Sequence, residues 1–89
     1  MAGYNIIYYG KAEKQLKKIN KKELKIIFTK ISALKTVPHP ANSLKLINSG
    51  NYYRLRIGDY RVIYQVSEKA KEIYIVAVNH RSEIYKKFK

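Results

Sequence analysis

The sequence contains no cysteine and only two histidines, and this scarcity removes whole classes of site. Without cysteine, neither disulfide bonds nor thiolate metal sites can form. The two histidines, His39 and His80, argue against a structural zinc site because such sites need four ligands. We therefore expect a protein that uses no metal and no other cofactor, and a reducing compartment suits it.

Long apolar segments are also missing. The longest apolar run, Ile73 to Val78, is far shorter than the roughly 20 residues that a membrane-spanning helix needs. The amino terminus lacks the charged start and following apolar stretch that mark a secretory signal. These absences predict a cytoplasmic protein with no membrane partner.

Acidic residues are scarce as well: six stand against 19 lysines and arginines, and the formal net charge is +13. Such an excess repels itself in the free protein and attracts polyanions, so nucleic acid is the leading partner class. A basic membrane-surface protein should instead expose apolar residues on a lysine-rich helix, whereas here we expect the apolar helix positions to face the core. At 89 residues the chain can enclose one modest core, which predicts a single domain over residues 1–89.

The first half of the chain predicts one strand and two helices. Tyr4 to Tyr9 is rich in Ile and Tyr and is bounded by glycines, as expected for a strand. Apolar residues at helical spacing predict a helix from Lys11 to about Ile19, and Asn20 separates it from a second helix that begins near Lys21. The apolar stripe of the second helix consists of Leu24, Ile27, Phe28, Ile31 and Leu34.

The second half predicts strands joined by short turns. Two prolines make Val37 to Ser43 a loop, after which Leu44 to Ile47 is a short edge strand. A hairpin over Tyr52 to Val66 and a strand over Ile73 to Val78 follow, and tight turns make such strands antiparallel. The predicted fold is α+β, with an N-terminal strand, a helical hairpin that covers one face, and then an antiparallel sheet of three to four strands.

The hairpin from Tyr52 to Val66 is the most informative part of the chain. Alternating apolar residues flank Gly58-Asp59, and a two-residue loop that begins with glycine is a strong hairpin signal. This loop sets Arg56 opposite Arg61, with Arg54 on the same face. Directly opposed like charges destabilise a sheet, so we interpret the three arginines as a cluster that binds an anion. The core face carries Tyr53, Leu55, Ile57, Tyr60, Val62 and Tyr64.

Two segments, Tyr53 to Tyr64 (YRLRIGDYRVIY) and His80 to Tyr85 (HRSEIY), occur in this order with a strand between them, and together they resemble the RelE/ParE superfamily of bacterial and archaeal toxins. The resemblance covers essentially the whole chain. It implies a RelE-like fold, similar to that of microbial ribonucleases, in a toxin of a type II toxin-antitoxin system. The RelE branch implies an endoribonuclease, or mRNA interferase, that cuts messenger RNA in the ribosomal A site and inhibits translation. A RelB-like cognate antitoxin that wraps around the toxin is implied as well.

Metal-independent RNA cleavage by the neighbouring 2′-hydroxyl needs a base for that hydroxyl, cations around the phosphorane and an acid for the departing 5′-oxygen. Arginine holds phosphate through two parallel N–H groups and stays charged at any relevant pH. We therefore predict that Arg54 and Arg56 bind the substrate. Arg61 and Arg81 are predicted as catalytic cations.

Proton transfer is assigned to His80 and Tyr85, because histidine is the residue type whose side chain exchanges protons near neutrality and Tyr85 follows His80 closely in the sequence. Stacking on an RNA base is an alternative role for Tyr85. Some RelE-type toxins carry lysines in place of Arg54 and Arg56, and arginine cannot readily act as a base. Either His80 is the base, or the arginines only fix the RNA and raise the acidity of the 2′-hydroxyl. Glu83 is expected to orient an arginine.

Two other functions fit the same residues. ParE-type toxins of this superfamily poison DNA gyrase by binding it, and they have no need of a proton-transfer pair. A plain nucleic-acid-binding module would use Arg61 for affinity, so Arg61→Ala would weaken binding without abolishing any toxicity. For a toxin, we expect an antitoxin with an amphipathic helix and an acidic segment, because opposite charge best neutralises the arginine face.

Overall fold

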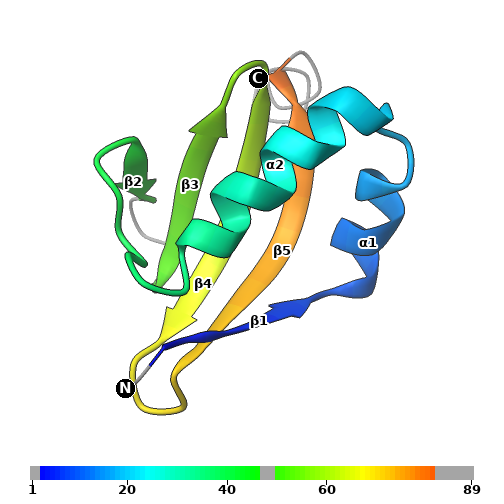
Figure 1. The fold of residues 1–89 in the computed structure, drawn as a ribbon. Helices are drawn as coiled ribbons and strands as arrows, with labels where there is room; N and C mark the ends of the chain where they lie inside the picture. Colours follow the sequence, from blue (N-terminus) through cyan, green and yellow to red (C-terminus); the bar gives the residue numbers. More distant parts are fainter. Residues whose placement is uncertain (1–2, 47–49, 82–89) are drawn as a thin grey trace.

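The computed structural model describes residues 3–46 and 50–81, which form two helices and one five-stranded sheet (Figure 1). The elements in chain order are β1 (Asn5–Tyr8), α1 (Gly10–Leu16), α2 (Lys21–Ala33), β2 (Ser43–Lys45), β3 (Tyr52–Ile57), β4 (Tyr60–Ser67) and β5 (Glu72–His80). Across the sheet the strands follow the order β1-β5-β4-β3-β2. The chain therefore returns its first strand to the edge beside its last one.

The predicted α+β fold is confirmed, and the sheet is mixed. The neighbouring strands from β2 to β5 pair antiparallel, as their short connections require. β1 pairs parallel with β5, from Asn5 opposite Glu72 to Tyr8 opposite Ile75. Both helices and three strands separate β1 from β5 in the chain, so no tight turn forces these two strands to be antiparallel.

Several boundaries differ from the predicted ones. β1 is one residue shorter at each end than the predicted strand from Tyr4 to Tyr9, and β5 extends beyond the predicted Ile73 to Val78 at both ends. α1 begins at Gly10 and ends at Leu16, whereas the apolar pattern extended this helix to about Ile19. Ile19 packs against the core from the connection between the helices, so its apolar character reflects burial and not helix. β2 begins one residue earlier than predicted and ends at Lys45, and Ile47 lies outside the described residues.

α2 begins after Asn20, whose side chain satisfies one free backbone N–H of the helix. The Asn20 side-chain oxygen accepts a hydrogen bond of 2.9 Å from the backbone N–H of Glu23, and the Asn20 amide donates to the Glu23 carboxylate at 2.6 Å. This reciprocal cap fixes the first turn of the helix. α2 has 13 residues, and no helix in the described part of the chain is both long and apolar enough to cross a membrane.

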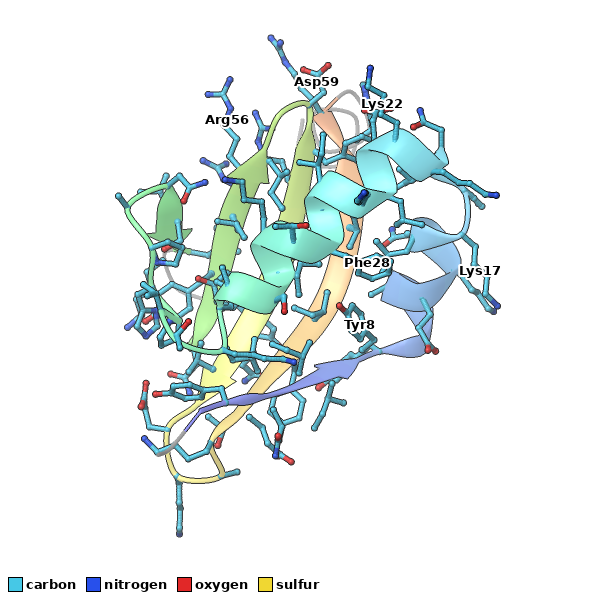
Figure 2. All side chains as sticks on the ribbon, in the orientation of Figure 1. Tyr8, Lys17, Lys22, Phe28, Arg56 and Asp59 are labelled. Atoms are coloured by element: carbon cyan, nitrogen blue, oxygen red, sulfur yellow. The ribbon has the colours of Figure 1, made fainter. Side chains whose placement is uncertain are left out.

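α2 lies across one face of the sheet, and the core fills the space between them (Figure 1). The fully buried large side chains come from both layers and are Tyr64, Ile27, Ile31, Leu34, Leu55, Ile73, Ile75 and Val62. The prediction that the whole α2 stripe faces the core is wrong for Phe28, which is 42% exposed. Phe28 lies at the border of the stripe and packs edge-on against Tyr8, with ring centroids 6.1 Å apart (Figure 2).

The central hairpin has the predicted register. Ile57 lies opposite Tyr60, Arg56 opposite Arg61 and Tyr53 opposite Tyr64. Gly58 has a φ of +59°, as the first position of a tight hairpin turn of this kind requires, and an L-residue rarely adopts that value. The alternation along β3 and β4 therefore sends Leu55, Ile57, Val62 and Tyr64 into the core, where all four are buried.

Candidate functional site

The three hairpin arginines lie on the sheet face that the helices leave uncovered. Arg56 is directly opposite Arg61, and Arg54 is opposite Ile63 one pleat further along. Leu55 and Val62, at the intervening positions, point to the opposite face and are buried beneath α2. We call the face that carries Arg54, Arg56 and Arg61 the arginine face. It carries the like-charged pair that the sequence predicted.

The opposed arginines take up different positions. The Arg61 guanidinium donates hydrogen bonds of 3.2 Å to the carbonyl oxygens of Gly58 and Tyr60, so it folds back onto the hairpin loop. Arg56 is exposed and projects outward at the same end of the sheet (Figure 2). Within the described residues, both ion pairs involve Glu68, so no described carboxylate pairs with Arg54 or Arg56. The positive charge of Arg54 and Arg56 thus remains available to an anionic ligand.

Arg81 joins the same end of the sheet through its backbone. The Arg81 N–H donates a 2.6 Å hydrogen bond to the carbonyl oxygen of Asp59, which continues the pairing of β5 with β4 into the hairpin loop. The Arg81 side chain is exposed. Four arginines from three neighbouring strand ends are therefore grouped near the Gly58-Asp59 loop.

His80 lies on the other face of the sheet. It is the β5 partner of Tyr60, and the two rings meet at right angles with centroids 5.2 Å apart. Tyr60 packs against the core, so the His80 ring is on the helix side while Arg56 and Arg61 are on the uncovered side. The structure brings His80 to the correct end of the sheet and not to the arginine face. Tyr85 and Glu83, the other candidates, lie outside the described residues.

A β-bulge in β5 accounts for the position of His80. Tyr64 pairs with Ile75, but Ile63 pairs with Ala77, so Val76 is an extra residue without a partner in β4. An extra residue reverses which positions face the core, because successive side chains alternate between faces. Ile73 and Ile75 face the helices before the bulge, and Val78 and His80 do so after it.

Sequence reasoning missed a pair of amide side chains that anchor this end of β5. β1 pairs only with residues 72–75 of β5, and α1 lies beside the following stretch. There the Gln15 side-chain oxygen accepts a 2.6 Å hydrogen bond from the Val78 N–H, and its amide donates at 2.8 Å to the Asn79 side chain, which is only 5% exposed. No sequence pattern joins Gln15 to Asn79, because their meeting depends on where α1 packs.

The described residues contain no group of three or more histidine, aspartate or glutamate side chains that could hold a metal ion. Among the described residues, the charged groups on the arginine face are guanidinium groups. Guanidinium groups can bind a phosphate group and polarise its oxygens without themselves exchanging protons. The arrangement is therefore chemically suited to an anion such as a phosphate.

Comparison with protein families gives one match. The family model of the ParE toxin of type II toxin-antitoxin system, parDE, matches residues 6–85. Among curated proteins, no match was found.

Solved structures resemble the chain over nearly its full length. The archaeal RelE in the RelE–RelB complex from Pyrococcus horikoshii is 31% identical, with a TM-score of 0.80, 91% of this chain covered and 97% of that one. A chain of the RelB–RelE antitoxin-toxin complex from Methanococcus jannaschii is 26% identical, with a TM-score of 0.77 and 93% and 99% of the two chains covered. The E. coli RelBE toxin-antitoxin complex shares the fold at 21% identity, with a TM-score of 0.77 and coverages of 86% and 95%. Together with the matched family model, these similarities show that the chain belongs to the RelE/ParE superfamily of toxins of type II toxin-antitoxin systems.

Proposed function

We propose that this toxin is a RelE-type, metal-independent endoribonuclease that cuts messenger RNA in the ribosomal A site and so inhibits translation. The observation that carries the proposal is the cross-strand pair of Arg56 and Arg61, with Arg54 on the same face and Arg81 tied to the hairpin loop. The identity of 31% to an archaeal RelE adds support. Action on ribosomes implies a cytoplasmic protein.

In the proposed reaction, a base takes the proton of the 2′-hydroxyl and its oxygen attacks the adjacent phosphorus atom. The bond from phosphorus to the 5′-oxygen breaks, an acid protonates that oxygen, and a 2′,3′-cyclic phosphate forms. The phosphorane carries more negative charge than the ground-state phosphodiester, so fixed cations stabilise it selectively. Arg61, held by the carbonyl oxygens of the loop, and Arg81 supply that charge in the proposal. Arg54 and Arg56 hold the RNA strand that leads to them.

Proton transfer by His80 requires the RNA to cross the end of the sheet. His80 and Arg61 lie on adjacent strands, which are separated by about 4.8 Å, but their side chains point to opposite faces. A nucleotide that passes over the hairpin loop can meet both, whereas one that lies flat on the arginine face meets only the arginines. The second path favours the alternative in which the arginines bind RNA and acidify the 2′-hydroxyl. Tyr85 remains a catalytic candidate on either path.

Primer extension on a message undergoing translation tests the proposal. The wild-type toxin should produce cuts in register with codons, and Arg61→Ala should reduce their rate by at least about tenfold, as loss of one stabilising cation does. Lys30→Ala, a loss of one charge on the exposed side of α2, is the matched control and should cut normally. Absence of codon-positioned cuts by folded wild-type protein contradicts the proposal.

Poisoning of DNA gyrase is the second candidate, because the matched family model is that of a ParE toxin and because His80 lies off the arginine face. This function would use the basic surface for binding alone. A gyrase supercoiling assay separates the two candidates. Inhibition of supercoiling without messenger cleavage would favour the gyrase poison.

We further propose that the cognate antitoxin docks an amphipathic helix with acidic flanks. Several relatives were crystallised as RelE–RelB complexes. The exposed Phe28 ring and the half-buried Tyr8 ring border a shallow groove of about 250 Å³ between α1 and α2 (Figure 2). Lys17 and one acidic residue, Glu13, line the groove, and Lys21 and Lys25 line a neighbouring pocket on α2 that shares Phe28 with it. An apolar stripe with acidic edges complements such a surface.

The salt dependence of the affinity shows whether charge or apolar packing dominates the proposed complex with the antitoxin. If opposite charge dominates, the affinity for the antitoxin should fall steeply between low and high salt. Surface plasmon resonance over a salt series measures this. An affinity that stays constant in concentrated salt would show that apolar packing dominates instead.

A further inference from the structure

We infer that this toxin has a second RNA contact, a pocket for a single guanine base at the end of the sheet opposite to the hairpin loop. The pocket measures about 500 Å³, which suits a small ligand. Its lining includes His39, Tyr53 and Glu68, and also Gln65 and Tyr74. Tyr53 points to the helix side of the sheet and Gln65 to the uncovered side, so the pocket lies around the end of the sheet. The inference rests on the proposal that RNA binds the arginine face, and it adds which base is recognised.

A ladder of aromatic rings forms one wall of this pocket. His39 lies 4.4 Å from Tyr53 between ring centroids, and Tyr53 stacks on Tyr64 at 5.6 Å with the planes 23° apart. Tyr64 is fully buried, and its hydroxyl donates a 2.7 Å hydrogen bond to the Pro38 carbonyl oxygen, so the core fixes the loop that carries His39. The His39 side chain is 41% exposed. A rigid aromatic platform with an exposed outer ring is the usual surface on which an RNA base stacks.

Glu68 supplies the hydrogen-bond acceptor of the pocket, and contacts with its neighbours fix the orientation of its carboxylate. The Tyr4 hydroxyl donates a 2.5 Å hydrogen bond to Glu68 Oε1, and this bond is the main reason that the pKa of Tyr4 is raised. Lys71 lies 3.9 Å from the same oxygen, and His39 Nε2 lies 3.8 Å from Oε2. The Glu68 side chain is nevertheless 62% exposed, so its carboxylate can still accept hydrogen bonds from a ligand.

The chemistry of these groups selects guanine. Guanine presents two adjacent donors, N1–H and the N2 amino group, and a carboxylate can accept from both at once. Adenine presents an acceptor at N1, which a carboxylate repels. The amide side chain of Asn51 lines the same pocket and can donate to guanine O6, while Lys69 attracts a phosphate. Aromatic wall, paired acceptor and amide donor thus occur together.

One part of the pocket lining lies on the arginine face. Gln65 lies on that face, because it is two pleats beyond Arg61 along β4 and opposite Tyr74 of β5. At about 3.3 Å per residue, the distance from Arg61 to Gln65 is about 13 Å. An RNA strand whose phosphates contact the arginines can therefore extend along the sheet, turn around its end past Gln65 and place a neighbouring base in the pocket.

Titration with mononucleotides tests the inference without ribosomes or cleavage. The His39 and tyrosine resonances in NMR spectra should shift on addition of GMP, and GMP should bind about tenfold more tightly than AMP, as one paired contact to a base edge provides. Glu68→Gln should abolish this preference. His39→Ala should weaken both nucleotides about tenfold, and His39→Tyr, which keeps a ring, should restore binding. Glu13→Gln, the same chemical change on α1, should change nothing.

The results separate this inference from the proposed function. Equal affinity for GMP and AMP, or a preference that survives Glu68→Gln, overturns the guanine pocket even if the protein cuts messenger RNA. A GMP preference lost in Glu68→Gln supports the pocket even if no cleavage occurs on ribosomes. If the toxin does cleave, Glu68→Gln should also reduce the share of its cuts that lie near guanine.

Discussion

Replacing Gln15 by alanine should destabilise the fold more than any other single change on the exposed half of α1. The Gln15 side chain is the hydrogen-bond partner of the Val78 N–H and of Asn79, and Asn79 is 5% exposed. A buried polar group left without its partner costs about 1–3 kcal/mol. Gln15 is only half-buried, so water can replace part of the loss, and we expect a total of about 1.5–3 kcal/mol for the two groups.

Thermal unfolding followed by circular dichroism measures this cost. For a domain of this size, 1 kcal/mol corresponds to about 4–8 °C, so the Tm of Gln15→Ala should fall by at least about 6 °C. Lys14→Ala, on the adjacent exposed position of the same helix, controls for helix propensity and should shift the Tm by no more than about 3 °C. If the two variants melt within about 2 °C of each other, the amide pair does not anchor β5 and the reasoning fails.

Three further changes test other parts of the structure. Arg56→Ala removes one of two opposed like charges, worth about 0.2–1 kcal/mol, so its Tm should be equal to or above that of the wild type while toxicity in a growth assay falls; a clear loss of Tm contradicts this. Asn20→Ala removes the cap of α2 and should cost about 1 kcal/mol in urea denaturation, whereas Asn20→Ser should retain most of the stability. Burial raises the pKa of Tyr64, so the unfolded chain releases this proton first and stability should fall as the pH rises above about 10; Tyr64→Phe should flatten that fall in unfolding measured from pH 8 to 11, and an unchanged slope would refute it.

The hairpin could be predicted residue by residue because its determinants are local. Gly58 supplies the positive φ of the turn, and a two-residue loop leaves a single register for the flanking strands. Alternation then decides the face of each side chain, so Arg54, Arg56 and Arg61 were correctly grouped. The order of the elements followed from the same local patterns of apolar residues and turn residues.

The side of the sheet on which His80 lies could not be predicted, because it depends on a bulge. Continuous alternation from Ile73 and Ile75 would send His80 to the arginine face, and the extra residue Val76 reverses this. A valine in a run of apolar residues gives no sign of being unpaired. The exposure of Phe28 could not be predicted either. Phe28 lies at the border of the apolar stripe, and whether its ring is buried depends on how closely β1 and α1 approach α2.

The bulge therefore separates two kinds of chemistry at one end of the molecule. Arginine side chains gather on the uncovered face, where they can hold a phosphate, while the histidine is packed on Tyr60 behind them. Gln15 makes this arrangement rigid, because it anchors β5 just after the bulge and just before His80 and Arg81. Gln15→Ala should for this reason lower messenger cleavage by more than its loss of stability explains, when activity is measured well below the Tm. If the residual activity instead follows the folded fraction alone, the orientation of the end of β5 does not matter for function, and the arginines act only as a diffuse positive surface.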